Sequence, residues 1–236
     1  MFKKRNNQLE RIDTGDYTPE EYEQFLREIS RVNRFAGDNL TLRKTLLREI
    51  ERENLQSFSV LDVGAGSGEL LRTIAKFARK QNRKADLCGL ELNVRSATAI
   101  LEESKNFTGI RAVRGDALNL PFADNAFDYA ICSLFTHHFT NEDIVRILDE
   151  MARVSRRKIF VIDLHRHQIA YYFYTTVGKI FIHSSLVRED GALSILRSFK
   201  PSELEKLGQT ANLAELSVAR HFPFRLVLQA KKDVPK

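Results

Sequence analysis

A glycine-rich segment is the clearest candidate for a binding site in this sequence. It contains, in order, Gly64, Ala65, Gly66, Ser67 and Gly68. Glycine reaches positive φ angles without strain and lets the backbone approach a ligand, and a following helix aims its first N–H groups at that ligand. Asp62, just before the glycines, would face a phosphate badly but suits a ligand with a cationic amino-acid end. A dinucleotide is disfavoured, because its fingerprint needs a glycine where this chain has Glu69.

Polar side chains also end three later apolar runs. At these ends stand Glu91 with Leu92, Asp116 with Ala117, and Ser133. Because the carboxyl ends of parallel strands meet at the edge where open α/β folds bind ligands, we expect these residues to lie near the glycine segment. Each acid alone also fits a plainer role. Asp62 and Asp116 could be solvated strand-end caps, and Glu91 could pair with Arg95 on the next helical turn.

Four of the six histidines lie in two short segments after predicted strands. His137 and His138 follow one apolar run, and His165 and His167 follow the next. A neutral imidazole accepts a proton near neutral pH, so these segments could supply a general base. We take His138 as the first candidate, His165 as the second and His137 as the third, although a single histidine is more often a hydrogen-bonded structural residue. No closely spaced set of Cys and His indicates a metal site.

The elements that would hold these residues alternate along the chain. Short apolar runs predict strands at 58–63, 86–91, 110–114, 127–133, 157–163, 214–220 and 224–230. Amphipathic stretches predict helices at 69–80, 94–104, 141–154 and 201–212. This alternation indicates an α/β protein with a Rossmann-like, doubly wound sheet of seven strands, mostly parallel. Only Phe222-Pro223 separates the last two runs, which should form a terminal antiparallel hairpin.

Two further parts accompany this sheet. Residues 1–56 are expected to form an N-terminal helical extension, loose over 1–16 and with its first long helix at 19–35. Residues 57–236 form the main domain. An insertion at about 165–200 is rich in Tyr, Phe and Ile, so we expect it to bury these side chains as a lid beside the first helix and to line a pocket.

The composition is that of an ordinary globular protein with a formal net charge of +6. Cys88 and Cys132 lie inside apolar runs and are expected to be buried, which fits a reducing, cytoplasmic compartment. No apolar stretch reaches the ~20 residues that span a bilayer. Basic residues at 72–84 recur at helical spacing opposite apolar ones, as on the solvent face of a helix, so a nucleic-acid partner is disfavoured.

In order and spacing, these features resemble class I S-adenosylmethionine-dependent methyltransferases. The resemblance rests on the glycine segment behind Asp62, on Glu91 and Asp116, and on a Leu-Pro-Phe and Phe-Asp pattern within 120–133. It implies S-adenosylmethionine as the cofactor, with Glu91 accepting hydrogen bonds from the ribose hydroxyls. It also implies that Asp116 contacts the adenine amino group and that the N–H of Ala117 faces the ring.

The resemblance extends to the acceptor. Residues 133–139 resemble the HH loop of ubiquinone and menaquinone methyltransferases, and 190–204 resemble bacterial methyltransferases with phenolic or polyketide-like acceptors. The Pro-Pro-Tyr or Pro-Pro-Phe motif of amine methylation is absent at 133–136, and the usual Pro-Gly-Gly turn is absent at 151–158. We therefore expect O- or C-methylation of a small, apolar, aromatic or quinone-like molecule. An RNA-directed methyltransferase and a non-catalytic S-adenosylmethionine-binding protein are the alternatives, and a homodimer stays open.

Overall fold

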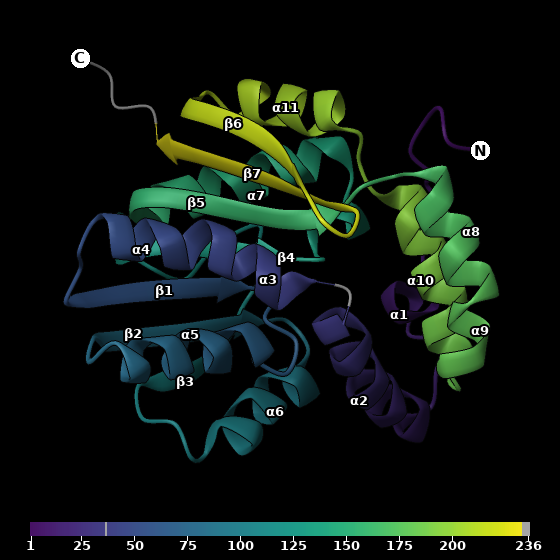
Figure 1. Ribbon diagram of the computed structural model, residues 1–236, viewed down its shortest axis with the longest axis horizontal. Helices are drawn as coiled ribbons and strands as arrows, with labels where there is room; N and C mark the ends of the chain where they lie inside the picture. The colour runs from purple at the N-terminus through teal and green to yellow at the C-terminus, as the bar shows by residue number, and fades with distance from the viewer. Residues whose placement is uncertain (36, 233–236) are drawn as a thin grey trace.

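The computed structural model describes residues 1–35 and 37–232 and shows a sheet covered by helices on both faces (Figure 1). The strand order is β3-β2-β1-β4-β5-β7-β6. The strands are β1 Ser57–Val63, β2 Lys84–Glu91, β3 Ile110–Arg114, β4 Phe127–Ser133, β5 Ser155–Leu164, β6 Leu213–His221 and β7 Arg225–Lys232. Strands β1 to β5 are parallel, and β7 pairs antiparallel with β5 and β6. The predicted seven-stranded, Rossmann-like sheet is confirmed. The last four positions of the expected main domain lie outside the described residues.

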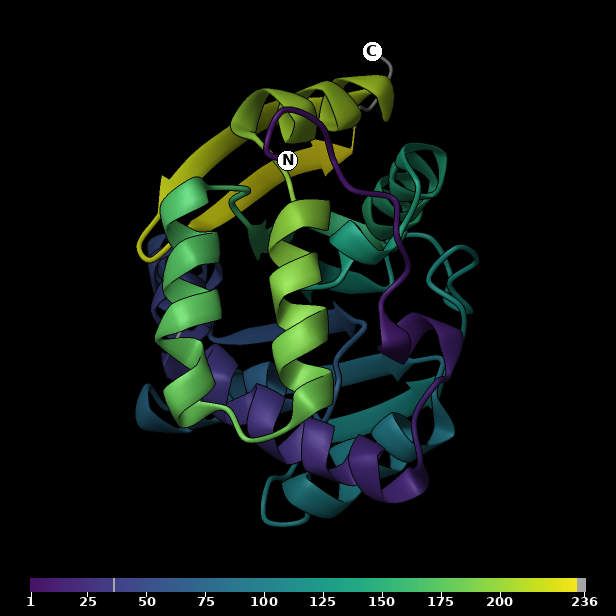
Figure 2. The ribbon, with the colours of Figure 1, turned by 90° about the vertical axis from the view of Figure 1, so that its right-hand side faces the viewer.

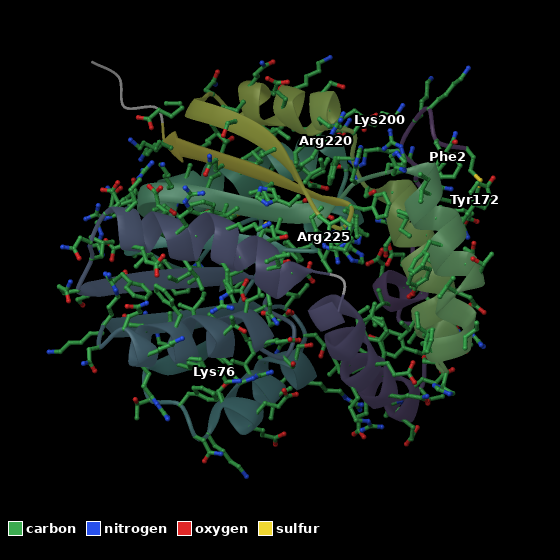
Figure 3. All side chains as sticks on the ribbon, in the orientation of Figure 1. Phe2, Lys76, Tyr172, Lys200, Arg220 and Arg225 are labelled. Carbon is green, nitrogen blue, oxygen red and sulfur yellow. The ribbon has the colours of Figure 1, made fainter. Side chains whose placement is uncertain are left out.

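Helices pack on the sheet through two apolar clusters. These helices are α3 Asp38–Leu42, the π-helix η1 Arg43–Leu47, α4 Arg48–Arg52, α5 Glu69–Lys80, α6 Val94–Ser104, α7 Asn141–Val154 and α11 Pro201–Thr210. In one cluster, the helices from α3 through α6 pack on one face of the sheet. In the other, α7 and α11 pack on the opposite face. The central strands are apolar on both sides because both sides are covered. Lys76 lies on the outer side of α5, as predicted for this basic stretch (Figure 3).

The first sixteen residues are held against the rest of the chain, so the prediction that they are loose is wrong. Helix α10 (Ser185–Arg197) ends beside them, and the last carbonyls of a helix have no partner within it. The N–H of Asn6 donates to the carbonyl of Leu196 at 3.0 Å, and Nε of Arg5 donates to the carbonyl of the final helical residue at 2.7 Å. A polar segment is ordered here because it caps a helix end.

A group of helices covers the edge of the sheet at which the parallel strands end. It consists of α1 Arg11–Thr14, α2 Pro19–Phe35, α8 Gln168–Thr176, α9 Gly178–Phe181 and α10. The strands point toward these helices in Figure 1, and Figure 2 views them from outside. Arg166 ties the two ends of the insertion together, because its N–H donates to the carbonyl of Phe199 at 2.8 Å and its Nη2 donates to Glu203 at 2.6 Å. The insertion thus has the position expected of a lid.

The prediction that the lid buries its apolar side chains is only partly right. Ala170 and Ile182 are buried, and the hydroxyl of Tyr174 donates to the carbonyl of Val187 at 2.6 Å. Other large side chains of α8 and α9 face solvent. Helix α9 continues in the direction of α8, and only one side of this helical run can pack on the rest of the lid (Figure 1). Among the described residues, no helix is long and apolar enough to cross a membrane.

Candidate active site

The glycine segment leaves β1 in a conformation that glycine takes most easily. Gly64, Gly66 and Gly68 have φ angles of 71°, 57° and 81°, all in the left-handed region. A Cβ built on Gly64 would lie 2.3 Å from the ring of Phe135, whereas one built on Gly66 meets no described atom within 4 Å. The backbone at Gly66 therefore borders open space that a ligand could fill.

Two buried polar atoms at the ends of neighbouring strands lack partners. Neither Oδ1 of Asp62, in β1, nor Oγ of Ser133, in β4, has a hydrogen-bond partner among the described residues. Asp62 is 1% exposed, and burial together with the charge of Glu91 raises its pKa to about 8. An unsatisfied buried carboxyl group is costly, so a ligand that brings a positive charge or hydrogen-bond donors would relieve it. These atoms fit the amino-acid end of S-adenosylmethionine.

Glu91 links β2 to the glycine segment. Its Oε1 accepts a hydrogen bond from the N–H of Gly66 at 2.6 Å. Burial raises the pKa of this carboxyl group to about 7, although hydrogen bonds from backbone N–H groups oppose the rise. Tyr22 of α2 lies close by, since burial and, more weakly, the charge of Glu91 raise the pKa of its phenol. The alternative pairing of Glu91 with Arg95 is not found among the described ion pairs.

Two of the remaining predicted cofactor residues, Asp116 and Leu92, lie at the surface. Asp116 is exposed, and its Oδ1 accepts a hydrogen bond from the N–H of Leu118 at 2.9 Å. This hydrogen bond fits the alternative role of Asp116 as a solvated strand-end cap. Ala117 is buried and Leu92 is exposed. The contacts of Asp116 and Ala117 with adenine stay predictions.

His137 has the geometry of an oriented base. Its Nδ1 lies 2.6 Å from Oδ1 of Asp163, at the end of β5, and Oδ2 of Asp163 accepts hydrogen bonds from the hydroxyl of Thr136 at 2.6 Å and from the backbone N–H of His137 at 3.2 Å. Burial alone would raise the pKa of Asp163, but the charge and hydrogen bonds of these partners lower it to about 2. An ionised Asp163 holds the proton of the imidazole on Nδ1 and leaves Nε2 as an acceptor. Nε2 lies 3.9 Å from Oε1 of Glu10.

His138, the first candidate by sequence, already has a carboxylate partner. Its Nδ1 lies 2.7 Å from Oδ1 of Asp13 in α1. The guanidinium of Arg197 donates to the other oxygen of Asp13 at 2.9 Å and lies 3.6 Å from Glu10. Ligand atoms of Glu10, His137 and His138 lie within 4.8 Å of one another, a spacing that a metal ion could use. Because Arg197 already places a positive charge there, we assign no metal ion to this cluster.

The other two histidines form a second pair. Their rings are 5.4 Å apart, and the ring of His167 is 5.3 Å from that of Phe224 near the start of β7. Burial, then the charges of His167, Arg220, Arg166 and Lys200, lower the pKa of His165 to about 4. An imidazole of such low basicity is a weak proton acceptor, so the structure favours His137 over His165 as the base.

A cavity of about 810 Å³ adjoins the first histidine pair. Its walls include the segment 4–9, η2 (Thr136–His138), and parts of α7 and α11. Apolar Val145 and Leu207 line it together with the cationic side chains of Arg5 and Lys206. This volume suits a small organic molecule.

Three residues of this site, Asp163, Glu10 and Phe135, are not among the residues predicted from the sequence. Asp163 ends an apolar run just as Glu91 does, so the same signal could have found it. Glu10 lies in a polar segment with no pattern of its own, and Phe135 differs from other apolar residues only through its packing on the glycine segment.

Comparison with known proteins gives a family match over part of this chain. Residues 60–158 match the family described as methyltransferase domain. The demethylmenaquinone methyltransferase of Bacillus licheniformis is 28% identical over 98 residues, which are 42% of this chain and 40% of that protein. The probable tRNA methyltransferase 9B of Homo sapiens is 31% identical over 109 residues, 46% and 21% of the two chains. This chain therefore spans less than half of the length of these relatives.

A solved structure supports the fold. The S-adenosylmethionine-dependent methyltransferase from Aquifex aeolicus aligns with a TM-score of 0.60 over 87% of this chain and 97% of that one. At 15% identity, the likeness concerns the fold alone. Together, residues 60–158 match a methyltransferase-domain family, and the chain has the fold of an S-adenosylmethionine-dependent methyltransferase.

Proposed function

We propose that this protein binds S-adenosylmethionine and methylates a hydroxyl or activated carbon of a small, largely apolar aromatic molecule. The observation that carries the proposal is that Oδ1 of Asp62 and Oγ of Ser133, on the neighbouring strands β1 and β4, are buried without a hydrogen-bond partner among the described residues. Asp62 would pair with the ammonium group of the cofactor, and Glu91 with its ribose hydroxyls. The cofactor supplies a methyl group on a positively charged sulfur.

His137 supplies the acid–base part of the proposal. With its proton held on Nδ1 by Asp163, Nε2 is ready to accept the proton of an acceptor hydroxyl. Because Nε2 and Oε1 of Glu10 are 3.9 Å apart, one hydroxyl oxygen could lie about 2.8 Å from both. Burial raises the pKa of Glu10 to about 7, so its protonated carboxyl group would donate to the hydroxyl oxygen while His137 takes the hydroxyl proton.

The walls of the cavity support the acceptor class. Val145 and Leu207 would contact an apolar ring or tail, and Arg5 and Arg197 would favour a phenolate or enolate. A quinone-type relative supports the same class.

The test has two parts. Calorimetry should show S-adenosylmethionine binding to the full chain, and a tritium-transfer assay should then label at least one member of a panel of phenols and hydroxyquinones. Failure to bind S-adenosylmethionine would contradict the whole proposal. Binding with labelling of tRNA and not of the panel would favour the RNA alternative, and binding without any transfer would favour the non-catalytic one.

A further inference from the structure

The outer face of the lid carries large apolar side chains that face solvent. They are 58–74% exposed: Ile169, Tyr172, Phe173, Ile180 and Phe181. The first three, on α8, recur at i, i+3 and i+4 and therefore share one helical face. Single exposed apolar residues are normal, but five within the helices α8 and α9 form a patch, and such patches mark interaction sites.

The N-terminal segment extends this surface. The ring of Phe2 lies 5.6 Å from that of Tyr171 and 6.3 Å from that of Tyr172. Figure 3 shows Phe2 and Tyr172 together at the outer edge of the molecule. We call Phe2 and the five exposed lid residues the apolar patch.

The segments that carry the patch have only positive charges. The sequence has no acidic residue between 164 and 188, nor in the first nine positions, which include Lys3 and Lys4. Lys200 and Arg220 lie on the same side of the molecule in Figure 3, close enough to His165 for their charges to lower its pKa. An apolar surface with a cationic border complements a lipid surface with anionic headgroups.

We propose that the apolar patch docks the protein on an anionic lipid bilayer. The exposed rings enter the boundary between headgroups and acyl chains, and the basic residues contact the anionic headgroups. The contact is peripheral, since no described helix is long and apolar enough to span a bilayer. The proposal goes beyond the proposed function and does not need it, although docking beside the lid would bring an apolar acceptor to the site.

A second copy of the chain is the competing occupant. A two-fold symmetric contact through this patch would bring the basic residues of both copies together, and like charges across an interface oppose association. An anionic bilayer meets the same residues with the opposite charge.

Vesicle flotation tests the proposal on the full chain. We expect binding to vesicles of phosphatidylcholine and phosphatidylglycerol in equal parts, at least tenfold weaker binding to pure phosphatidylcholine, and loss of binding at 0.5 M salt. The double variant Phe173→Ser/Phe181→Ser should lower partitioning at least tenfold. The matched control Leu101→Ser, at a 51% exposed leucine of α6, should leave it unchanged.

Thermal melting and S-adenosylmethionine affinity of each variant show that the fold is intact, and neither measurement depends on an acceptor. Equal partitioning of the wild type and the double variant would overturn the proposal. So would indifference to the lipid charge. A wild-type dimer in sedimentation that the double variant converts to a monomer, without vesicle binding, would assign the patch to a second copy.

Discussion

The buried carboxyl group of Asp62 is expected to lower the folding stability of the protein and to strengthen S-adenosylmethionine binding. Its pKa is about 8 in the folded chain and about 3.9 when unfolded, so between these values the folded state holds more protons. Stability therefore falls as pH rises through this window. Asp62→Asn keeps the shape without the charge, and calorimetry at pH 8 should show a Tm several degrees higher with at least tenfold weaker S-adenosylmethionine binding. Asp128→Asn is the control, because Asp128 accepts hydrogen bonds from Ser59 and should lose Tm without losing affinity.

The same group predicts a pH dependence of binding. Pairing with an ammonium group requires ionised Asp62, whose pKa of about 8 means that binding releases a proton at lower pH. We expect the Kd of S-adenosylmethionine to fall from pH 6 to pH 7.5, by up to tenfold per pH unit. Adenosine lacks the amino-acid end and should show a flatter profile by calorimetry. Parallel profiles for the two ligands would remove Asp62 from the ammonium site.

The two neighbouring histidines should differ in their effect on turnover. His137→Ala removes the imidazole oriented by Asp163, and general-base help is typically worth ~10²–10⁴ in rate. With an accepted phenol, kcat should fall within that range while cofactor affinity stays near wild type, and Asp163→Asn should also lower kcat. His138→Ala, whose ring is held by Asp13, should change kcat less than tenfold. A larger loss in His138→Ala would restore the ranking that the sequence suggested.

At the scale of elements, the turn from β1 into α5 contains a glycine, Gly66, that we expect to leave room for a ligand as well as to allow the backbone to turn. Gly66 and Gly15 both have positive φ and no described atom within 4 Å of a built Cβ. Alanine at either position pays a similar backbone cost of about 1–2 kcal/mol. Only Gly66→Ala should also weaken S-adenosylmethionine binding, which calorimetry on both variants measures. If Gly15→Ala weakens binding equally, the effect is global destabilisation and the space beside Gly66 is not the cofactor site.

At the scale of the whole molecule, Arg5 fastens the N-terminal segment over the histidines. It donates to the carbonyls of Arg197, His137 and Phe139 and to the side chain of Asn141. Losing these bonds should cost about 2 kcal/mol, so Arg5→Ala should lower Tm by about 4–8 °C. Lys3→Ala, at an exposed neighbour, is the matched control and should leave Tm unchanged in the same calorimetric scan. A Tm loss of the same size in both variants would show that the segment is not held through Arg5.

Local patterns were enough to predict the sheet and to bring the candidate cofactor residues to one of its edges. Strand and helix periodicity, the glycine segment and the acid at a strand end are each written in a few consecutive residues, so they placed Asp62, Glu91 and Ser133 at one edge before any contact was known. The order of parallel strands then follows from right-handed crossovers, which leave few topologies.

Contacts between distant segments decided the rest. The sequence alone could not decide between His137 and His138 as the base, because each ring is held by a carboxylate far away in the chain. Asp163, 26 residues from His137, contacts one ring, and Asp13, 125 residues from His138, contacts the other. The sequence also could not predict that residues 1–16 are ordered, because they are held by carbonyls at the C-terminal end of α10. It could not show which face of the lid would stay in solvent. Composition fixes how apolar a segment is, but only packing fixes which of its side chains are covered.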